Sequence, residues 1–348
     1  MDLLLMDVEL YFMDYVNPVA AYSRRLKMKK LLAMFTIVAM MFYLTACNNT
    51  NKNQEVSNHK LTIVASLFPQ YDFTRQIVGD KADVKLLLPP GIESHTFDPR
   101  PSDISNIYNA DMFIYTSKYM EPWAEKVVEG VSNKNLLVID ASNGISLVKE
   151  EHDHDEHKGD HKEDHHDEDE HQHEYDPHIW LDPTLAMKMV DNIVVGLCEK
   201  DARNAEFYRK NADNYKKELQ KLDDDIFKAV KNSKRDTLVF GGRFAYSYFL
   251  NHYGLKYESA YDSCSTEGEP SVQTITSIID YIKKNNIPCI YHEEFVEPKV
   301  AKSIAHQTGI SAELFSTAHN LSKDQLGDKI TYINIMRENL ESIKKGLN

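Results

Sequence analysis

Residues 202–233 read ARNAEFYRKNADNYKKELQKLDDDIFKAVKNS and contain neither glycine nor proline. One set of apolar residues recurs at spacings of four and three: Tyr208, Ala212, Tyr215, Leu219, Leu222, Ile226 and Ala229. This period places them on one face of a single long amphipathic helix. A coiled-coil dimer seam has a similar repeat, but here the repeat covers only about three heptads. Because strand-and-helix patterns flank the segment on both sides, we expect it to connect two parts of one chain.

Short apolar runs alternate with helix-length segments on both sides of this helix. On its N-terminal side the predicted strands lie at residues 61–67, 84–88, 112–115 and 136–139. On its C-terminal side we expect strands at 237–241 and 288–292, and helices at 271–285, 297–308 and 330–345. Strands separated by helices indicate mostly parallel sheets in layered α/β units. The predicted fold class is therefore α/β, with two small (β/α) lobes, each with its own core, joined by one long helix.

Acidic residues concentrate in one segment of the chain. Residues 150–176 hold fourteen Asp and Glu against Lys158 and Lys162, so this segment carries −12 of the formal net charge of −14. The rest of the chain is nearly neutral and has no basic stripe that could contact a phosphate backbone. Nucleic-acid binding is therefore not expected.

The same segment is rich in histidine. Its imidazoles belong to His152, His154, His157, His161, His165, His166, His171 and His173. With almost no apolar residues the segment cannot form a core of its own. We interpret this histidine tract as a mobile, low-affinity collector of metal ions; the alternative is an inert solvated linker with a chance composition.

The N-terminal region carries the pattern of an export signal. A basic MKK that begins at Met28 precedes an apolar stretch at residues 31–44, which is too short for an ordinary membrane span. A membrane anchor helix is the alternative. The sequence LTAC that ends at Cys47 resembles a bacterial lipobox, which implies cleavage before Cys47 and acylation of its thiol. Met28 is the expected start of the protein.

These features predict the following organisation. Residues 1–27 are an upstream extension that is not native, residues 28–46 are a lipoprotein signal peptide, and residues 47–58 are a flexible tether. Residues 59–200 form an N-terminal α/β lobe, which includes the disordered His/Asp-rich loop 150–175. Residues 201–234 form the connecting helix, and residues 235–348 form a C-terminal α/β lobe.

Two histidines outside the tract stand in ordered surroundings. His95 lies in LLLPPGIESHTFDPRPSDI, residues 86–104, where a predicted strand ends and a loop follows. Loops after the carboxyl ends of strands are where open α/β sheets bind their ligands. His178 lies in DPHIWLDP, residues 176–183, beside apolar residues that must be buried, and a histidine held by packed neighbours is a preorganised ligand. We expect both to bind metal; a hydrogen-bonded structural histidine is the alternative for either one.

Several motifs together resemble the metal-binding lipoproteins of bacterial ABC importers for zinc and manganese, of the ZnuA/AdcA/TroA type. The motifs are PPGIESHTFDPRPSDI, YMEPWAEKV, DPHIWLDP, FAYSYFLNHYGLKY and HEEFVEPKVAKSIA, and the resemblance covers roughly residue 61 to the C-terminus. It implies two lobes joined by one rigid helix, with the metal site in the cleft between them. It also implies that His95 and His178 are ligands from the N-terminal lobe, and a His/Asp-rich loop ahead of the second motif is typical of zinc members.

The chain departs from this family at its other two ligands. The usual third ligand, His or Glu, falls at Arg243, whose guanidinium is always protonated and offers no lone pair. The usual fourth ligand, an acid, falls near Thr331, and Asp328 would take its place only if the register slipped.

Other donors in the second half of the chain could replace these ligands. His319 follows the apparent last strand and is the favoured replacement, and Glu294 is the next. A salt bridge from Glu293 or Glu294 to the arginine fits the sequence equally well. Cys264 is a possible soft ligand, although a disulfide with Cys289 or a free thiol is also open.

The donor types favour zinc. Neutral imidazole suits zinc, and three histidines would bind Zn²⁺ tetrahedrally with one open position. The expected function is extracytoplasmic capture of Zn²⁺ and its delivery to the permease of an ABC importer. We expect the protein to be a monomer and not an enzyme. We also expect lipid at Cys47 to anchor it to the bacterial cell membrane. The alternatives are a Mn²⁺ or iron importer component, a zinc-dependent hydrolase, although no HExxH motif is present, and a metal-stabilised surface adhesin.

Overall fold

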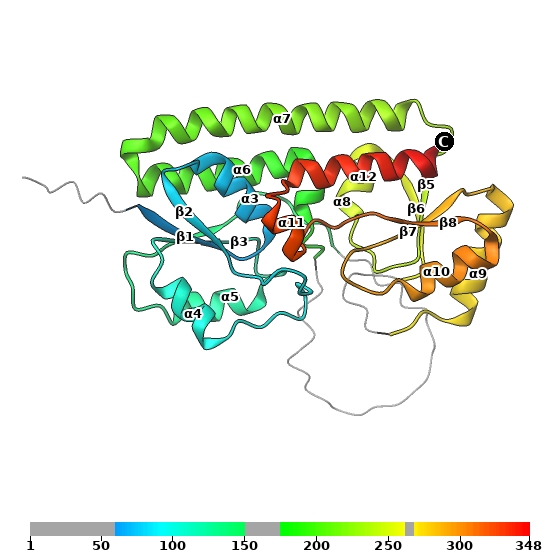
Figure 1. Ribbon diagram of the computed structural model, residues 1–348, viewed down its shortest axis with the longest axis horizontal. Helices are drawn as coiled ribbons and strands as arrows, with labels where there is room; N and C mark the ends of the chain where they lie inside the picture. The colour runs from blue at the N-terminus through cyan, green and yellow to red at the C-terminus, as the bar shows by residue number, and fades with distance from the viewer. Residues whose placement is uncertain (1–59, 150–174, 262–267) are drawn as a thin grey trace, which may run out of the picture. The chain divides into compact units, whose positions relative to one another are not determined.

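The computed structural model describes residues 60–149, 175–261 and 268–348 (Figure 1). The predicted extension, signal peptide and tether with Cys47, the histidine tract and Cys264 lie outside these ranges. Within them, no helix combines the length and the apolar character that a membrane crossing requires.

The first sheet has four parallel strands in the order β2-β1-β3-β4. The strands are β1 (Leu61–Ala65), β2 (Ala82–Leu86), β3 (Met112–Tyr115) and β4 (Leu137–Asp140), and the helices that follow them are α3 (Phe68–Val78), α4 (Pro101–Tyr108), α5 (Pro122–Glu129) and α6 (Pro183–Lys200). Each of these helices has proline in its first turn, where the fixed φ and the missing N–H suit a helix start. Strand β2 begins and ends two residues earlier than predicted, and Leu87 and Leu88 lie buried in the turn after it.

The second sheet repeats this arrangement with the order β6-β5-β7-β8, again all parallel. Its elements are β5 (Thr237–Phe240), α8 (Ser247–Tyr253), β6 (Lys256–Ser259), α9 (Val272–Asn285), β7 (Cys289–His292), α10 (Lys299–Thr308) and β8 (Ser311–Leu314). The sequence does not predict β6, because this edge strand reads KYES and has no apolar run. Two parallel four-stranded sheets confirm the predicted α/β class.

The predicted long helix is confirmed as α7 (Ala205–Lys231), which follows one turn of 3₁₀ helix, η3 (Ala202–Asn204). Its predicted stripe is buried, apart from Ala229, which is half-buried. The helix packs against α3 and α6 from the first sheet's side and against α12 (Tyr332–Leu347) from the C-terminal end of the chain (Figure 1). Asp223 interrupts the apolar stripe and accepts hydrogen bonds from Tyr253 (2.9 Å) and His252 (2.8 Å) of α8. The helix therefore contacts elements of both halves.

The apolar core differs from the prediction that each lobe has a core of its own. One cluster of buried side chains runs from Ile63 of β1 through Trp180 and Tyr332 to Phe240 of β5. A smaller cluster lies between the first sheet and α4 and α5, and another between the second sheet and α9 and α10. The shared core arises because α12 returns to pack on α3 and α7 as well as on the second sheet.

A buried carboxylate also joins the two halves. Asp72 of α3 is fully buried and pairs with Arg75, at 2.6 Å from Nε to Oδ1. Its other oxygen accepts from the backbone N–H of Tyr332 in α12 (2.8 Å) and from the hydroxyl of Tyr215 in α7 (3.3 Å). Because a buried carboxylate needs such partners, this contact holds α3 against α7 and α12.

Candidate metal centre

The structure brings together the two histidines predicted from the N-terminal half. His95 lies in the loop between β2 and α4, and His178 directly precedes the 3₁₀ turn η2 (Ile179–Leu181). Their Nε2 atoms are 3.2 Å apart. Two nitrogen atoms from distant parts of the sequence therefore point at one place.

His178 is held rigidly. Its side chain is 1% exposed, and its Nδ1 lies 2.8 Å from Oδ1 of Asp176, which also accepts the backbone N–H of His178 at 2.9 Å. A carboxylate at Nδ1 places the ring proton there and leaves the Nε2 lone pair facing His95. The Asp-Pro-His spacing therefore supplies a histidine with a fixed tautomer. The sequence singled out the histidine, but not the supporting role of Asp176.

His319 follows β8 and is buried. Its Nδ1 contacts the hydroxyl of Thr317 and lies 3.6 Å from Oε1 of Glu294, whereas its Nε2 is buried without a hydrogen-bond partner. Burial lowers the pKa of His319; Glu294 and Glu93 oppose this, and His178 adds to it. Burial therefore favours the neutral imidazole of His319, whose Nε2 has no hydrogen-bond partner.

The segment that carries His319, residues 317–321, is bonded directly to the first half of the chain. The carbonyl of Thr317 accepts a hydrogen bond from Nε1 of Trp180, in η2, at 2.7 Å. The amide of Asn320 donates to the carbonyls of Pro89 (2.8 Å) and Ile92 (2.7 Å), in the loop of His95. These bonds set His319 against the loops of the other two histidines. The sequence does not predict this role of Asn320.

Glu294, the next predicted ligand, has both oxygen atoms engaged by Thr317. Oε2 accepts the backbone N–H at 2.8 Å, and Oε1 accepts the hydroxyl at 2.9 Å. The carboxylate of Glu294 thus lies on the Nδ1 side of the His319 ring, opposite the unpartnered Nε2.

Arg243, at the family's third ligand position, follows β5. Its backbone N–H donates to Oε2 of Glu293 at 3.1 Å, and a Cβ on the neighbouring Gly242 would lie only 1.8 Å from that oxygen, so the position needs glycine. Burial raises the pKa of Glu293, and Arg243 opposes the rise. The guanidinium forms its ion pair with Glu93, at 3.7 Å from Nη1 to Oε2. The salt bridge that the sequence suggested to Glu293 or Glu294 is therefore made with Glu93, which the sequence did not single out.

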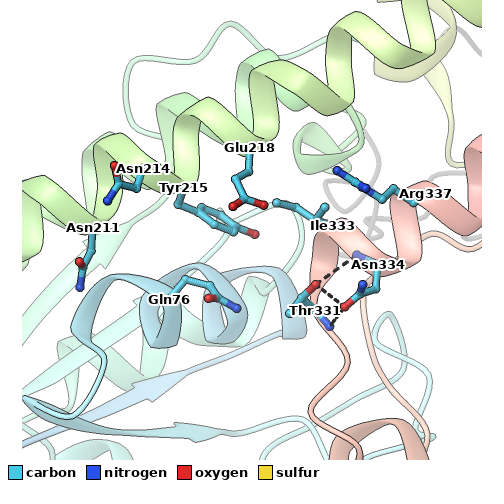
Figure 2. A pocket seen from close by; sticks show the side chains of 9 residues that line it. All are labelled: Gln76, Asn211, Asn214, Tyr215, Glu218, Thr331, Ile333, Asn334 and Arg337. Carbon is cyan, nitrogen blue, oxygen red and sulfur yellow. Dashed lines mark hydrogen bonds between the residues drawn. The ribbon is translucent and has the colours of Figure 1, made fainter.

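Thr331, at the family's fourth ligand position, has a structural role instead. Its hydroxyl caps α12 by accepting from the N–H of Asn334 at 3.1 Å (Figure 2). It lines a cavity of about 510 Å³ between α3, α7 and α12, which none of the predicted ligands lines. Asp328 is exposed at the end of α11 (Lys323–Gly327). Cys289 is a buried free thiol.

The three histidines do not form a complete ligand set in this structure. Across the described parts of the chain, no three His, Cys, Asp or Glu side chains lie close enough together to hold a metal ion. The pair of His95 and His178 is preformed, and a third donor would have to approach it.

Comparisons with known proteins agree with this architecture. Residues 63–346 match the family described as "ZnuA: Zinc-uptake complex component A periplasmic". The chain is 37% identical over 321 residues to the high-affinity zinc uptake system protein ZnuA of Bacillus subtilis, which covers 92% of this chain and 98% of that protein. It is 32% identical to the zinc-binding lipoprotein AdcA of Streptococcus pneumoniae over 91% of this chain, but spans only 61% of AdcA.

Solved structures give the same result. The Zn(II)-bound ZnuA-like domain of S. pneumoniae AdcA superposes with a TM-score of 0.68 at 28% identity, over 83% of this chain and 99% of that chain. The laminin-binding protein Lmb of Streptococcus agalactiae, described as a bifunctional protein with adhesin and metal transporting activity, gives 0.68 at 29% identity, over 83% of this chain and all of that chain. With a family match that spans most of its length, the chain belongs to the ZnuA family of zinc-uptake complex components.

Proposed function

We propose that this protein captures Zn²⁺ outside the cytoplasm and delivers it to an ABC importer, with His95, His178 and His319 as its metal ligands. The observation that carries the proposal is the 3.2 Å distance between the Nε2 atoms of His95 and His178. Two imidazole nitrogens that each lie about 2.0–2.1 Å from one tetrahedral zinc ion are roughly 3.3 Å apart. The pair thus has the spacing that a shared zinc ion requires.

The chemistry of the neighbouring groups also supports zinc. Both nitrogens must offer lone pairs, and the carboxylate of Asp176 favours this state in His178 by holding the proton at Nδ1. His319 contributes the third imidazole through its unpartnered Nε2. Glu294 then acts behind His319 as its orienting carboxylate rather than as the ligand that the sequence suggested. A site dominated by imidazole suits zinc better than manganese.

The rest of the transport cycle rests on sequence and family. The tract of eight histidines would collect zinc weakly and raise its local concentration, while the histidine pair holds it tightly. Lipid at Cys47 would keep the monomeric protein at the cell membrane, beside its permease. The division into lobes at 59–200 and 235–348, with a connecting segment at 201–234, stays a prediction. Binding and transfer need no chemical step, so we propose no enzymatic activity.

Zinc competition against a chromophoric chelator tests this function. The exported chain is compared with a form that lacks residues 151–174, and with His178→Ala and His319→Ala in the shortened form. His306→Ala, which alters an exposed histidine, is the matched control. We expect the shortened form and the control to keep one tight zinc, and each ligand substitution to weaken it by orders of magnitude.

Two results would count against the proposal. If deletion of the tract removed all tight binding, the histidine pair would not be a zinc site. If His319→Ala bound zinc as the control does, the third ligand would have to be sought elsewhere. Uptake of radioactive zinc by cells with and without the gene separates transport from storage.

A further inference from the structure

Two polar atoms at the candidate metal centre are buried without a hydrogen-bond partner: Nε2 of His319 and Oε2 of Glu93. Among the described residues, the hydroxyl of Thr74 is the only other buried side-chain atom in this condition. Most buried polar atoms in native proteins have a partner, and an unpartnered one calls for an explanation such as an ion. Glu93 and His319 come from opposite halves of the chain, and their segments are bonded directly: the amide of Asn320, next to His319, donates to the carbonyl of Ile92, next to Glu93, at 2.7 Å. The two unused atoms therefore lie in adjoining segments of the candidate metal centre.

The carboxylate of Glu93 is divided between two tasks. Oε1 accepts the backbone N–H of His95 at 3.1 Å and so helps to shape the loop that carries this ligand. Oε2 lies 3.7 Å from Nη1 of Arg243. That distance allows an ion pair but is too long for a hydrogen bond. Arg243 therefore offsets the negative charge of Glu93, while the lone pairs of Glu93 Oε2 stay unused.

We propose that Glu93 is a further ligand of the captured metal ion, and that Arg243 holds this carboxylate until the metal displaces the guanidinium. The proposal rests on the function proposed above. Zinc readily accepts a carboxylate oxygen beside imidazole nitrogens, so Glu93 would complete a set of three histidines and one acid. Arg243 cannot bind the ion itself, and its charge would repel a divalent cation. The arginine at the family's ligand position thus becomes an exchangeable counter-ion.

The structure also provides a place for the displaced guanidinium. A cavity of about 240 Å³ borders Arg243 and Gly242 at the carboxyl ends of β5 and β7. Its lining includes the carboxylates of Glu269, Glu293 and Glu297. A turn of the Arg243 side chain into this cavity would give its charge new partners as Glu93 gains the metal.

The test uses the exported chain at one equivalent of metal. Zinc affinity is measured by competition with a tight chromophoric chelator, and the ligand set is read from the visible absorption of bound Co²⁺. Glu93→Gln keeps an oxygen that can accept the His95 N–H but replaces the proposed ligand atom with an amide group. Asp98→Asn removes the same charge from an exposed position in the same loop and is the matched control. His178→Ala reports on the proposed function itself.

We expect Glu93→Gln to weaken zinc binding at least tenfold and to shift the Co²⁺ bands, while Asp98→Asn stays within about threefold of the parent. If Glu93→Gln instead matched Asp98→Asn in affinity and spectrum while His178→Ala lost tight binding, Glu93 would not be a ligand and the proposed function would stand. If His178→Ala also kept tight binding, the proposed function itself would fail.

The exchange with Arg243 has its own test. Arg243→Met should raise zinc affinity in the parent chain, because Glu93 is then no longer held by a competing cation. In the Glu93→Gln background this gain should shrink, since the residue for which the arginine competes has been removed. An equal gain in both backgrounds would overturn the exchange, because the arginine would then act only as a distant charge.

Discussion

The Nδ1 atom of His178 lies 2.8 Å from the carboxylate of Asp176, and the carbonyl of Asp176 in turn accepts the hydroxyl of Tyr248 at 2.7 Å. The imidazole is thus oriented by a residue two positions away, which is itself held by α8 of the second half of the chain. A carboxylate behind a metal-binding histidine fixes the tautomer and increases the basicity of the ligand atom.

Asp176→Asn should therefore weaken zinc binding by roughly 10- to 100-fold without loss of the fold. The amide oxygen can still accept from His178, but it lacks the charge that favours a proton at Nδ1. Chelator competition measures the affinity, and circular dichroism checks the fold. Asp191→Asn, which removes an exposed carboxylate from α6, is the control. Equal affinities of the two variants would show that Asp176 does not support the site.

Asn320→Ala should lower both stability and zinc affinity. The amide of Asn320 is 1% exposed, and its loss leaves the carbonyls of Pro89 and Ile92 without this donor. A buried group left unpaired costs about 1–3 kcal/mol in the free energy of unfolding, which urea denaturation measures. The zinc affinity should fall because the segment of His319 loses its attachment to the loop of His95.

Asn109→Ala is the matched control for that substitution. Asn109 also donates its amide to a backbone carbonyl, that of Ser105 at 2.8 Å, but at an exposed position within α4. Its loss should change the free energy of unfolding by much less than the loss of Asn320. If both variants were equally stable and bound zinc equally well, the contact made by Asn320 would have no part in the site.

The sequence predicts the features that depend on local signals. The length of α7 follows from a stretch without glycine or proline and from apolar residues at helical spacing. His178 stands out because an apolar triplet follows it directly. The loop of His95 is recognisable from the Pro-Pro-Gly that ends the preceding strand.

The remaining features depend on contacts between distant segments. Asn320 bonds to a carbonyl 231 positions away, and its own neighbours in sequence give no sign of that contact. Glu93 reads as an ordinary loop acid until the fold places it beside Arg243. The shared core cannot be predicted for the same reason, because only the path of α12 shows that one core serves both sheets.

Glu121 should make stability depend on pH. Burial raises its pKa from 4.5 to about 7, although hydrogen bonds from Ser66, Ser117 and Thr116 oppose the rise. Because the folded state binds this proton more tightly, the stabilisation is complete below about pH 4.5 and is lost as the pH rises through about 7. The change amounts to about 3 kcal/mol.

Urea denaturation of chelator-treated protein between pH 4.5 and 8 measures this effect. The difference in unfolding free energy between the parent and Glu121→Gln should fall with rising pH, because glutamine does not titrate. Glu125→Gln, at an exposed position in the same helix, should give a nearly constant difference from the parent. A constant difference for Glu121→Gln as well would mean that Glu121 titrates alike in the folded and unfolded states.

Cys289 should resist alkylation in the folded protein. Its thiol is 1% exposed in β7, and burial raises its pKa to about 11, so little reactive thiolate forms at pH 8. Iodoacetamide followed by peptide mapping should leave Cys289 unmodified in buffer and fully modified in urea, whereas the half-buried Cys198 should react earlier. Rapid labelling of Cys289 in the folded chain would mean that β7 opens far more readily than its burial implies.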